Sequence, residues 1–146
     1  MVVTVKEYLM QVRTLDTKVR VIDNEIKELR DEIAALRSSW PDGQPHGTGT
    51  TDPVGNQAAK LADKLTRLEM KQLRTRAQLW RKRAEVIETL SLLTNDTHYQ
   101  VLNLRYVQHL RWEQIADEMG YTKHHVYKIH GWALHELKQK MIPNDT

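Results

Sequence analysis

The sequence of 146 residues contains no cysteine and no phenylalanine, and it has only four prolines and six glycines. Without cysteine the chain can form neither a disulfide framework nor a thiolate site, which fits a reducing compartment. No apolar run approaches the roughly 20 residues needed to cross a bilayer. The first residues also lack the basic region and apolar core of a secretory signal peptide. We therefore expect a cytoplasmic protein that does not contact a membrane.

The scarcity of proline and glycine favours helices, and the spacing of the apolar residues predicts where they lie. The segment Thr4 to Glu7 has the pattern of a capping box, which places the start of a first helix at Thr4. The apolar residues after it alternate steps of four and three, as in the seam of a coiled coil: Leu15, Val19, Ile22, Ile26, Leu29, Ile33 and Leu36. A long helix with one such stripe needs a partner helix to be stable.

A linker separates this helix from a second one. Residues 40–55 hold three of the four prolines and four of the six glycines, so we predict a flexible linker at residues 39–55. No Lys-Ser or Lys-Thr follows these glycines, which argues against a phosphate-binding loop. The second helix is predicted from about residue 57 to residue 93. Its stripe begins with Leu61, Leu65 and Leu68 and then shifts around the helix to Leu73, Ala77, Trp80, Ala84 and Ile87. The two helices should form a long antiparallel coiled-coil hairpin over residues 1–94.

The net charge of +3 is unevenly distributed along the chain. Residues 3–37 hold seven basic and seven acidic residues and are neutral. Residues 56–84 hold nine basic and two acidic residues, a balance of +7, whereas residues 85–146 hold six basic and eight acidic residues, a balance of −2. The most basic segment is therefore the second helix of the predicted hairpin.

Part of this basic segment has no acidic residues to pair with. Folding the hairpin places acidic residues of the first helix beside the basic residues at 60–71. The basic group at 74–83 has few acidic residues opposite it, so most of its charge is not neutralised. Two interpretations of this group remain open. Its side chains either clamp DNA phosphates or form a solvated or dimer-facing surface; the candidate phosphate contacts are Arg74, Arg81, Lys82 and Arg83.

A compact three-helix module is predicted at residues 95–146. A first helix, capped at Thr97, should span about residues 98–109. Two further helices should flank Gly120, which can adopt the positive φ that ends a helix, and Thr122 should cap the second of them. Apolar residues recur at steps of three and four on both sides of this turn: Ile115, Ala116, Met119, Val126, Ile129, Ala133 and Leu137. The predicted fold is therefore all-α, a helical hairpin followed by a C-terminal helix-turn-helix module.

The residues around the turn carry a family resemblance. Ala116, Gly120 and the apolar positions beside them reproduce the spacing of the bacterial helix-turn-helix. The run from Val101 to Lys138, with its Leu-Arg-Tyr segment and its Ala-Leu-x-x-Leu tail, resembles region 4 of bacterial sigma factors. The whole layout resembles phage-encoded late transcription regulators of the RinA and ArpU type. One departure is Arg111, which stands where sigma modules usually have a Thr or Ser cap, so we expect the helix there to start loosely.

Such modules place the start of their second helix in the major groove of DNA. The side chains predicted to be exposed there, and so to read base edges, are Lys123, His124, His125, Tyr127 and Lys128. By the resemblance, Lys123, His124 and Lys128 occupy the positions that most often read the promoter. We count Arg111 and Thr122 as phosphate contacts. The competing interpretation is that these residues are the solvated face of a core helix.

Other side chains near the turn are expected to be structural. We expect Trp112 and Trp132 to be packing anchors. The histidines of the last helix stand one or five residues apart, without cysteine or an HExxH motif, so we predict no metal site and no cofactor. No nucleophile or acid–base constellation is evident, so we do not expect an enzyme.

The sequence thus predicts a sequence-specific double-stranded DNA-binding transcription regulator in a bacterial host cytoplasm. By the resemblance it could also recruit RNA polymerase. We expect a homodimer in which the edge of the hairpin, with Trp80, Val86 and Ile87, pairs with its copy, so that the dimer reads two half-sites. Two alternatives remain: a small terminase-like DNA-packaging protein, and a coiled-coil protein-binding adaptor, which the −2 balance after residue 84 favours.

Overall fold

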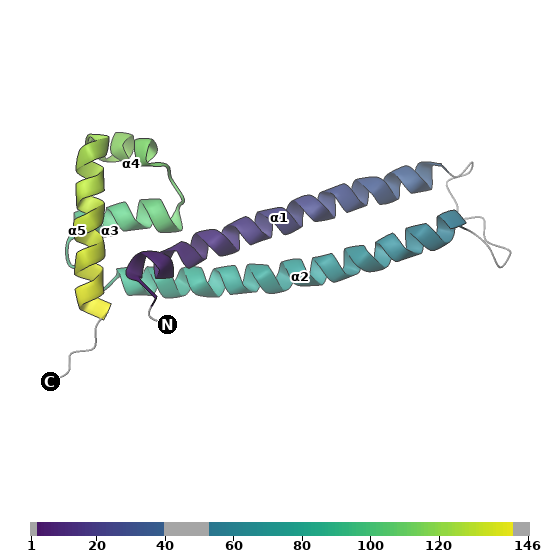
Figure 1. Cartoon of the computed structure of the whole chain (residues 1–146), viewed down its shortest axis with the longest axis horizontal. Coiled ribbons are helices and arrows are strands. Elements are labelled where there is room, and N and C mark those ends of the chain that lie inside the picture. Colours follow the sequence, from purple (N-terminus) through teal and green to yellow (C-terminus); the bar gives the residue numbers. More distant parts are fainter. Residues whose placement is uncertain (1–2, 40–52, 142–146) are drawn as a thin grey trace. The chain divides into compact units, whose positions relative to one another are not determined.

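The computed structural model describes residues 3–39 and 53–141. Within these ranges the chain is helical apart from short turns, and no strand is present. The elements in chain order are α1 (Val5–Ser38), α2 (Pro53–Leu90), α3 (Asp96–Leu102), the π-helix η1 (Asn103–Val107), α4 (Trp112–Met119) and α5 (Lys123–Met141). The predicted all-α class is confirmed, and α1 and α2 pack as a hairpin (Figure 1). The predicted linker lies largely outside the described residues.

The chain divides into two compact units that do not follow the predicted boundary between residues 94 and 95. The first unit combines residues 1–16 with residues 78–146, and the second unit consists of residues 17–77. The division differs from the prediction because the first turns of α1 and the last turns of α2 share a hydrophobic core with the C-terminal helices.

The start of α1 has the predicted cap. The amide of Glu7 donates to Thr4 Oγ1 over 3.1 Å, and the amide of Thr4 donates to Glu7 Oε2 over 3.3 Å. Each residue therefore satisfies an amide that the first helical turn would leave unpaired. The prediction that the helix starts at Thr4 is confirmed.

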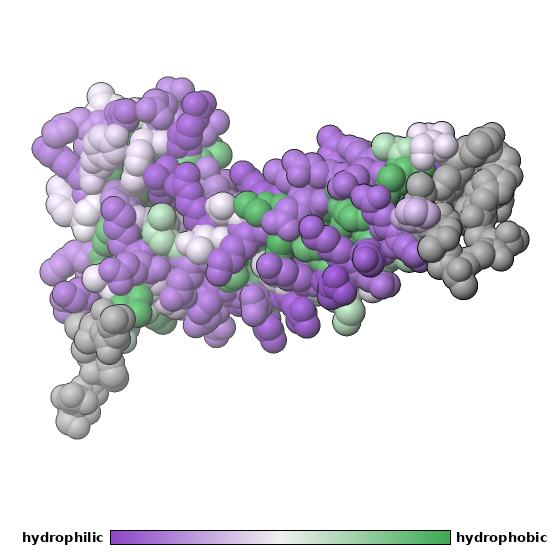
Figure 2. Space-filling view, turned by 45° about the vertical axis from the view of Figure 1, so that its right-hand side comes forward, coloured by the Kyte–Doolittle hydropathy of each residue, from purple (hydrophilic) through white to green (hydrophobic). Residues whose placement is uncertain are grey.

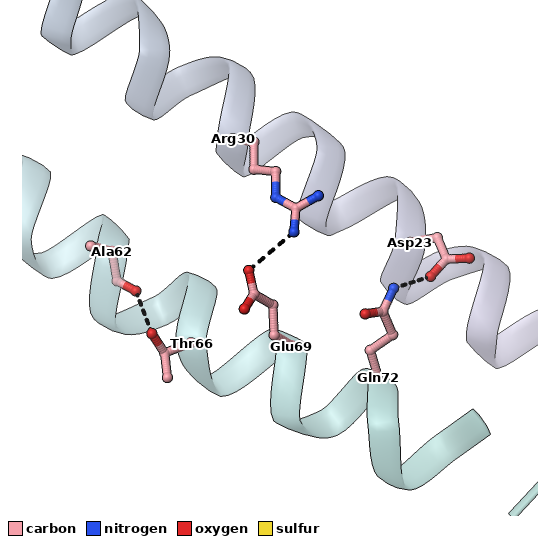
Figure 3. A network of polar contacts seen from close by, with 6 residues as sticks. All are labelled: Asp23, Arg30, Ala62, Thr66, Glu69 and Gln72. Atoms are coloured by element: carbon pink, nitrogen blue, oxygen red, sulfur yellow. Dashed lines mark hydrogen bonds and ion pairs between the residues drawn. The ribbon is translucent and has the colours of Figure 1, made fainter. Parts of the chain in front are cut away.

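In the second unit, the apolar seam of α1 is buried as predicted. Its buried members are Val19, Ile22, Ile26, Leu29 and Ile33, whereas Leu36 is half-buried. Polar contacts join the two helices beside this seam: Arg30 donates to Glu69 over 3.2 Å, and both Gln72 and Arg76 donate to Asp23 (Figure 3 shows the first of these and the Gln72–Asp23 contact). Figure 2 shows hydrophobic residues along the hairpin between hydrophilic ones.

The predicted shift of the stripe on α2 is wrong. Leu73 and Trp80 are 68% and 64% exposed, whereas the side chain of Thr75 is buried. Thr75 tolerates burial because its hydroxyl donates to the backbone oxygen of Lys71 over 2.8 Å, and half-buried Gln72 bonds to Asp23. The packed seam therefore continues without a shift through polar residues.

Helix α2 begins at Pro53 and ends at Leu90, rather than at the predicted residues 57 and 93. Proline is well accommodated in a first helical turn.

In the first unit, two residues of α1 that lie before the predicted seam are fully buried. Val12 continues the alternation three residues before Leu15, whereas Leu9 stands one residue away from the position that the alternation would reach. They join one hydrophobic core with residues of α2, of the connection after it, and of α3, η1 and α5: Val86, Leu90, Leu93, Leu102, Tyr106, Val107, Ala133 and Leu137. Because Val86 lies in this core, it cannot belong to the exposed dimer edge predicted from the sequence.

The helix before the turn differs from its prediction in two ways. Its cap is Asn95 rather than Thr97, because Asn95 Oδ1 accepts from the amides of Thr97 and His98 over 3.0 and 3.2 Å. The predicted single helix is also divided into α3 and the π-helix η1.

Among the described helices, none combines the length and apolar character that a membrane span needs.

The buried position of Leu9 leads to a stability prediction. Replacing Leu9 by Ala should lower the free energy of unfolding by about 2–5 kcal/mol, because it leaves a cavity in the core of the first unit. Urea denaturation followed by circular dichroism measures this change. Leu92→Ala is the matched control, since Leu92 is 45% exposed in the same unit and should lose less than about 1 kcal/mol. Equal losses for the two variants would contradict the placement of Leu9.

Candidate nucleic-acid interface

The turn between α4 and α5 has the geometry predicted from Gly120. This residue adopts φ 70° and ψ 29°, a left-handed conformation that glycine reaches without strain. The amide of Tyr121 donates to the oxygen of Ala116 over 3.0 Å, so the chain reverses directly onto the end of α4. The amides of Gly120 and Tyr121 are therefore both bonded to the last turn of α4.

Both helices of the pair have defined starts. Thr122 Oγ1 accepts from the amide of His125 over 3.1 Å, which confirms Thr122 as the cap of α5. Arg111 has no side-chain acceptor, as expected, but its own amide donates to Gln114 Oε1 over 2.9 Å. The side chain of Gln114 thus caps the amide of Arg111, which is the half of a capping box that does not require Ser or Thr. The prediction that α4 starts loosely is therefore wrong.

A small hydrophobic core holds α5 against α4. Ile115 and Val126 are fully inaccessible, and Ala116 and Ile129 are nearly so. They form one cluster with Val101 and Leu104 of the preceding helices. Since Val126 and Ile129 face this core, the residues between and before them must face outward.

The five predicted base-reading residues all lie on the first two turns of α5 and are exposed there. They are Lys123, His124, His125, Tyr127 and Lys128, and we call them the α5 ridge. Tyr127 is 43% exposed, although one edge of its ring packs on Trp112 with centroids 5.2 Å apart. The ridge therefore offers ammonium, imidazole and phenol groups in front of the turn.

Lys123 has a partner that sequence reasoning missed. Its Nζ lies 2.7 Å from Glu113 Oε1 on α4 and 5.9 Å from the centre of the Tyr127 ring. The hydrogen bond with Glu113 is the main cause that raises the pKa of Lys123, and the same bond lowers the pKa of Glu113. The two residues are ten positions apart, so no local pattern indicated this pair. It holds the ammonium group of Lys123 near the start of α4.

The two tryptophans near the turn have different environments. Trp112 is half-buried, packs against the core of the module, and lies edge-on to His130 at 4.8 Å, with the Arg105 guanidinium 4.4 Å from its ring centre. It is the packing anchor that we predicted. Trp132 is 54% exposed, so the same prediction for it is wrong. The centre of its ring lies 6.4 Å from that of His125.

Behind the ridge, His130 is bonded inside the protein. Its Nε2 lies 2.6 Å from the hydroxyl of Tyr106, and the two rings are stacked. Burial, and then the positive charges of Lys6 and Arg105, lower the pKa of His130 to about 4. This histidine is therefore neutral at physiological pH and acts as part of the support of α5.

The predicted phosphate contacts are distributed over several elements. Arg111 and Thr122 are exposed beside the two helix starts of the turn. Arg74 belongs to the second unit and Arg81 to the first, and both are exposed. Lys82 bonds to Glu85 over 2.9 Å and lies over the Tyr8 ring, and Arg83 lies 5.7 Å from the ring centre of Trp80. Arg111 and Thr122 thus lie at the starts of α4 and α5, in the same unit as the α5 ridge.

A search of the described residues finds no group of three or more metal-ligating side chains that could hold an ion. Comparison with known proteins adds no assignment: no family model matches the sequence, and no curated protein or solved structure is found to be similar to it. The turn and the α5 ridge are therefore the features of the chain that bear on its function.

The environment of His130 predicts how stability depends on pH. Between about pH 6.5 and pH 4, His130 takes up a proton in the unfolded chain but not in the folded chain. The free energy of unfolding should therefore fall by about 2–3 kcal/mol on this account as the pH drops through that window. In urea denaturation at several pH values, His130→Gln should lose this part of the dependence. If both proteins show the same slope, His130 does not titrate as its surroundings imply.

Proposed function

We propose that the protein is a sequence-specific double-stranded DNA-binding transcription regulator. The observation that carries this proposal is the α5 ridge: five polar side chains stand exposed on the first turns of a capped helix, directly after a tight helix-turn-helix turn. An α-helix fits the major groove of B-DNA, which is about 12 Å wide. Residues on the first turns of the second helix are the ones that reach base edges in this arrangement.

The chemistry of the ridge suits that role. Lysine ammonium groups can donate to O6 and N7 of guanine, and imidazole groups can donate or accept at a base edge. His124 and Lys128 are one turn apart on α5 and so share one side of the helix. The free amides at the start of α5 add a positive end to the helix dipole, which attracts phosphate.

The local charge supports this role better than the sum over the C-terminal residues. Residues 123–128 contain two lysines and no acidic residue, whereas Glu113, Asp117 and Glu118 lie on α4. Glu113 is bonded to Lys123, which offsets its repulsion of an approaching phosphate. Of the acidic residues on α4, Glu113 therefore lies at the first turn of α5, and its charge is paired there.

The resemblance to region 4 of sigma factors and to phage late regulators supports the same assignment. It implies in addition that the module recruits RNA polymerase to the DNA that it binds. A packaging protein or a coiled-coil adaptor would share the helical hairpin, but neither would need an ordered set of base-reading groups on α5. Binding selectivity therefore distinguishes these functions.

Selection of bound sequences from random DNA duplexes tests the proposal. The purified full chain should enrich one motif, because the capped turn fixes the positions of its base-reading side chains. A packaging protein would be expected to return weak or diffuse enrichment, and an adaptor none. Absence of an enriched motif at low salt, where phosphate contacts are strongest, would refute the proposal.

Lys128 allows a sharper test on the enriched duplex. Lys128→Ala should weaken its binding by about tenfold, since a good contact to a base contributes on the order of 1–3 kcal/mol. Lys138→Ala, in the last turns of α5, is the matched control and should change binding by less than about threefold. Fluorescence anisotropy measures both. Equal affinities for the two variants would remove Lys128 from the base-reading set.

A further inference from the structure

Helix α2 carries a second apolar repeat on the side that does not pack against α1. Its members are separated by alternating steps of three and four, the spacing of a coiled-coil seam: Met70, Leu73, Ala77, Trp80, Ala84 and Ile87. We call this set the outer seam. All six are exposed, and the four large side chains are 38–68% exposed. A contiguous exposed apolar stripe of this kind marks a contact surface.

All six residues of the outer seam belong to one continuous helix, α2. The alanines sit on either side of Trp80 in the repeat. They leave space for a large ring at that position, as alternating large and small layers do in packed helical cores.

We propose that the outer seam binds the outer seam of a second copy of this chain, with the two α2 helices parallel and in register. Each layer then contains the same residue from both copies. The two indole rings of Trp80 meet between an alanine layer above and an alanine layer below. This inference does not depend on the DNA-binding proposal.

The charges beside the outer seam support the parallel orientation. In a parallel pair, a residue just before one core position faces the residue five places further on in the other helix. Glu69 then faces Arg74 of the second copy, and Arg83 faces Glu88 of the second copy. Glu69 is also bonded to Arg30, and it is exposed enough to accept a second donor. Opposite charges therefore meet at two places on each side of the seam.

One like-charge pair remains in this arrangement. Arg76 faces Arg81 of the second copy, but Arg76 is already bonded to Asp23 over 3.0 Å, which offsets its charge. Within the described residues Arg81 has no bonded partner, so it remains a donor at the rim of the interface.

The antiparallel orientation is less favourable. It would bring Arg74 against Arg81 of the second copy, and Arg76 against Arg83 of the second copy. Only Arg67 and Glu88 would attract each other there. Since like charges opposite each other destabilise a helix pair, the charge pattern selects the parallel dimer.

This dimer assigns a role to the basic group at residues 74–83. Arg74, Arg81 and Arg83 act at the rim of the dimer interface, which is the second of the two interpretations left open by the sequence. Because residues 80–87 of both copies lie side by side, the dimer has the two-fold symmetry that a reader of two half-sites requires.

Cross-linking tests the register, and the absence of cysteine from the chain makes single-cysteine variants clean probes. Ala84→Cys should form a disulfide dimer under mild oxidation, because a parallel pair places both copies of residue 84 in one layer. Gln78→Cys, exposed on α2 but outside the outer seam, is the matched control and should stay reduced. An antiparallel pair would separate the two copies of residue 84 by about 16 Å along the axis and prevent the bond. Failure of Ala84→Cys to cross-link would therefore overturn the proposal.

Sedimentation equilibrium of the full chain provides the second readout. The unaltered chain should be a dimer, and Trp80→Glu should raise the dimer dissociation constant at least about 30-fold while helicity is retained. Trp132→Glu changes a tryptophan that is 54% exposed on α5, outside the outer seam, and should leave the dimer intact. A monomer at all concentrations, as expected if a different protein covers the outer seam, would contradict the inference. So would a dimer that is insensitive to Trp80→Glu.

Discussion

The burial of Val126 and Ile129 against α4 determines which side of α5 faces outward. Gly120 and Thr122 fix the turn, but these two apolar side chains set the rotation of α5 about its own axis. The α5 ridge is exposed because its members occupy the remaining positions of the same turns. The module can therefore present a fixed set of donors and acceptors without any of them taking part in the core. Trp112 and the His130–Tyr106 pair support α5 from the inside.

A related constraint operates on α2, where polar residues occupy the packed seam. Gln72 and Thr75 can be partly or fully buried because each has a hydrogen-bond partner, Asp23 for the first and the Lys71 oxygen for the second. The apolar residues on the other side of the helix are consequently left outside. Polar residues thus take positions in the packed seam of α2, and apolar residues of the same helix form the outer seam. In our proposal this surface joins two copies, so that one helix serves both folding and assembly.

Sequence periodicity predicted the local features of the fold and missed those that depend on distant residues. The seam of α1, the cap at Thr4 and the turn at Gly120 follow from spacings of a few residues. The burial of Leu9 depends on residues more than 70 positions away, and the bond between Lys123 and Glu113 depends on the crossing of two helices. The stripe on α2 was misplaced because periodicity follows apolar side chains and does not detect a polar residue with a satisfied hydrogen bond. The five ridge residues were exposed as expected, since the apolar pattern on either side of Gly120 leaves them no place in the core.

The most direct measurement is to map the DNA contact on the isotopically labelled full chain by nuclear magnetic resonance, using the duplex enriched by selection. Our interpretation predicts the largest amide and side-chain shifts at residues 122–128 and at Arg111, with small changes in the second unit. Line broadening at the histidine and lysine side chains of the α5 ridge should accompany them. Shifts confined to α1 or α2, with residues 122–128 unchanged at saturation, would contradict it.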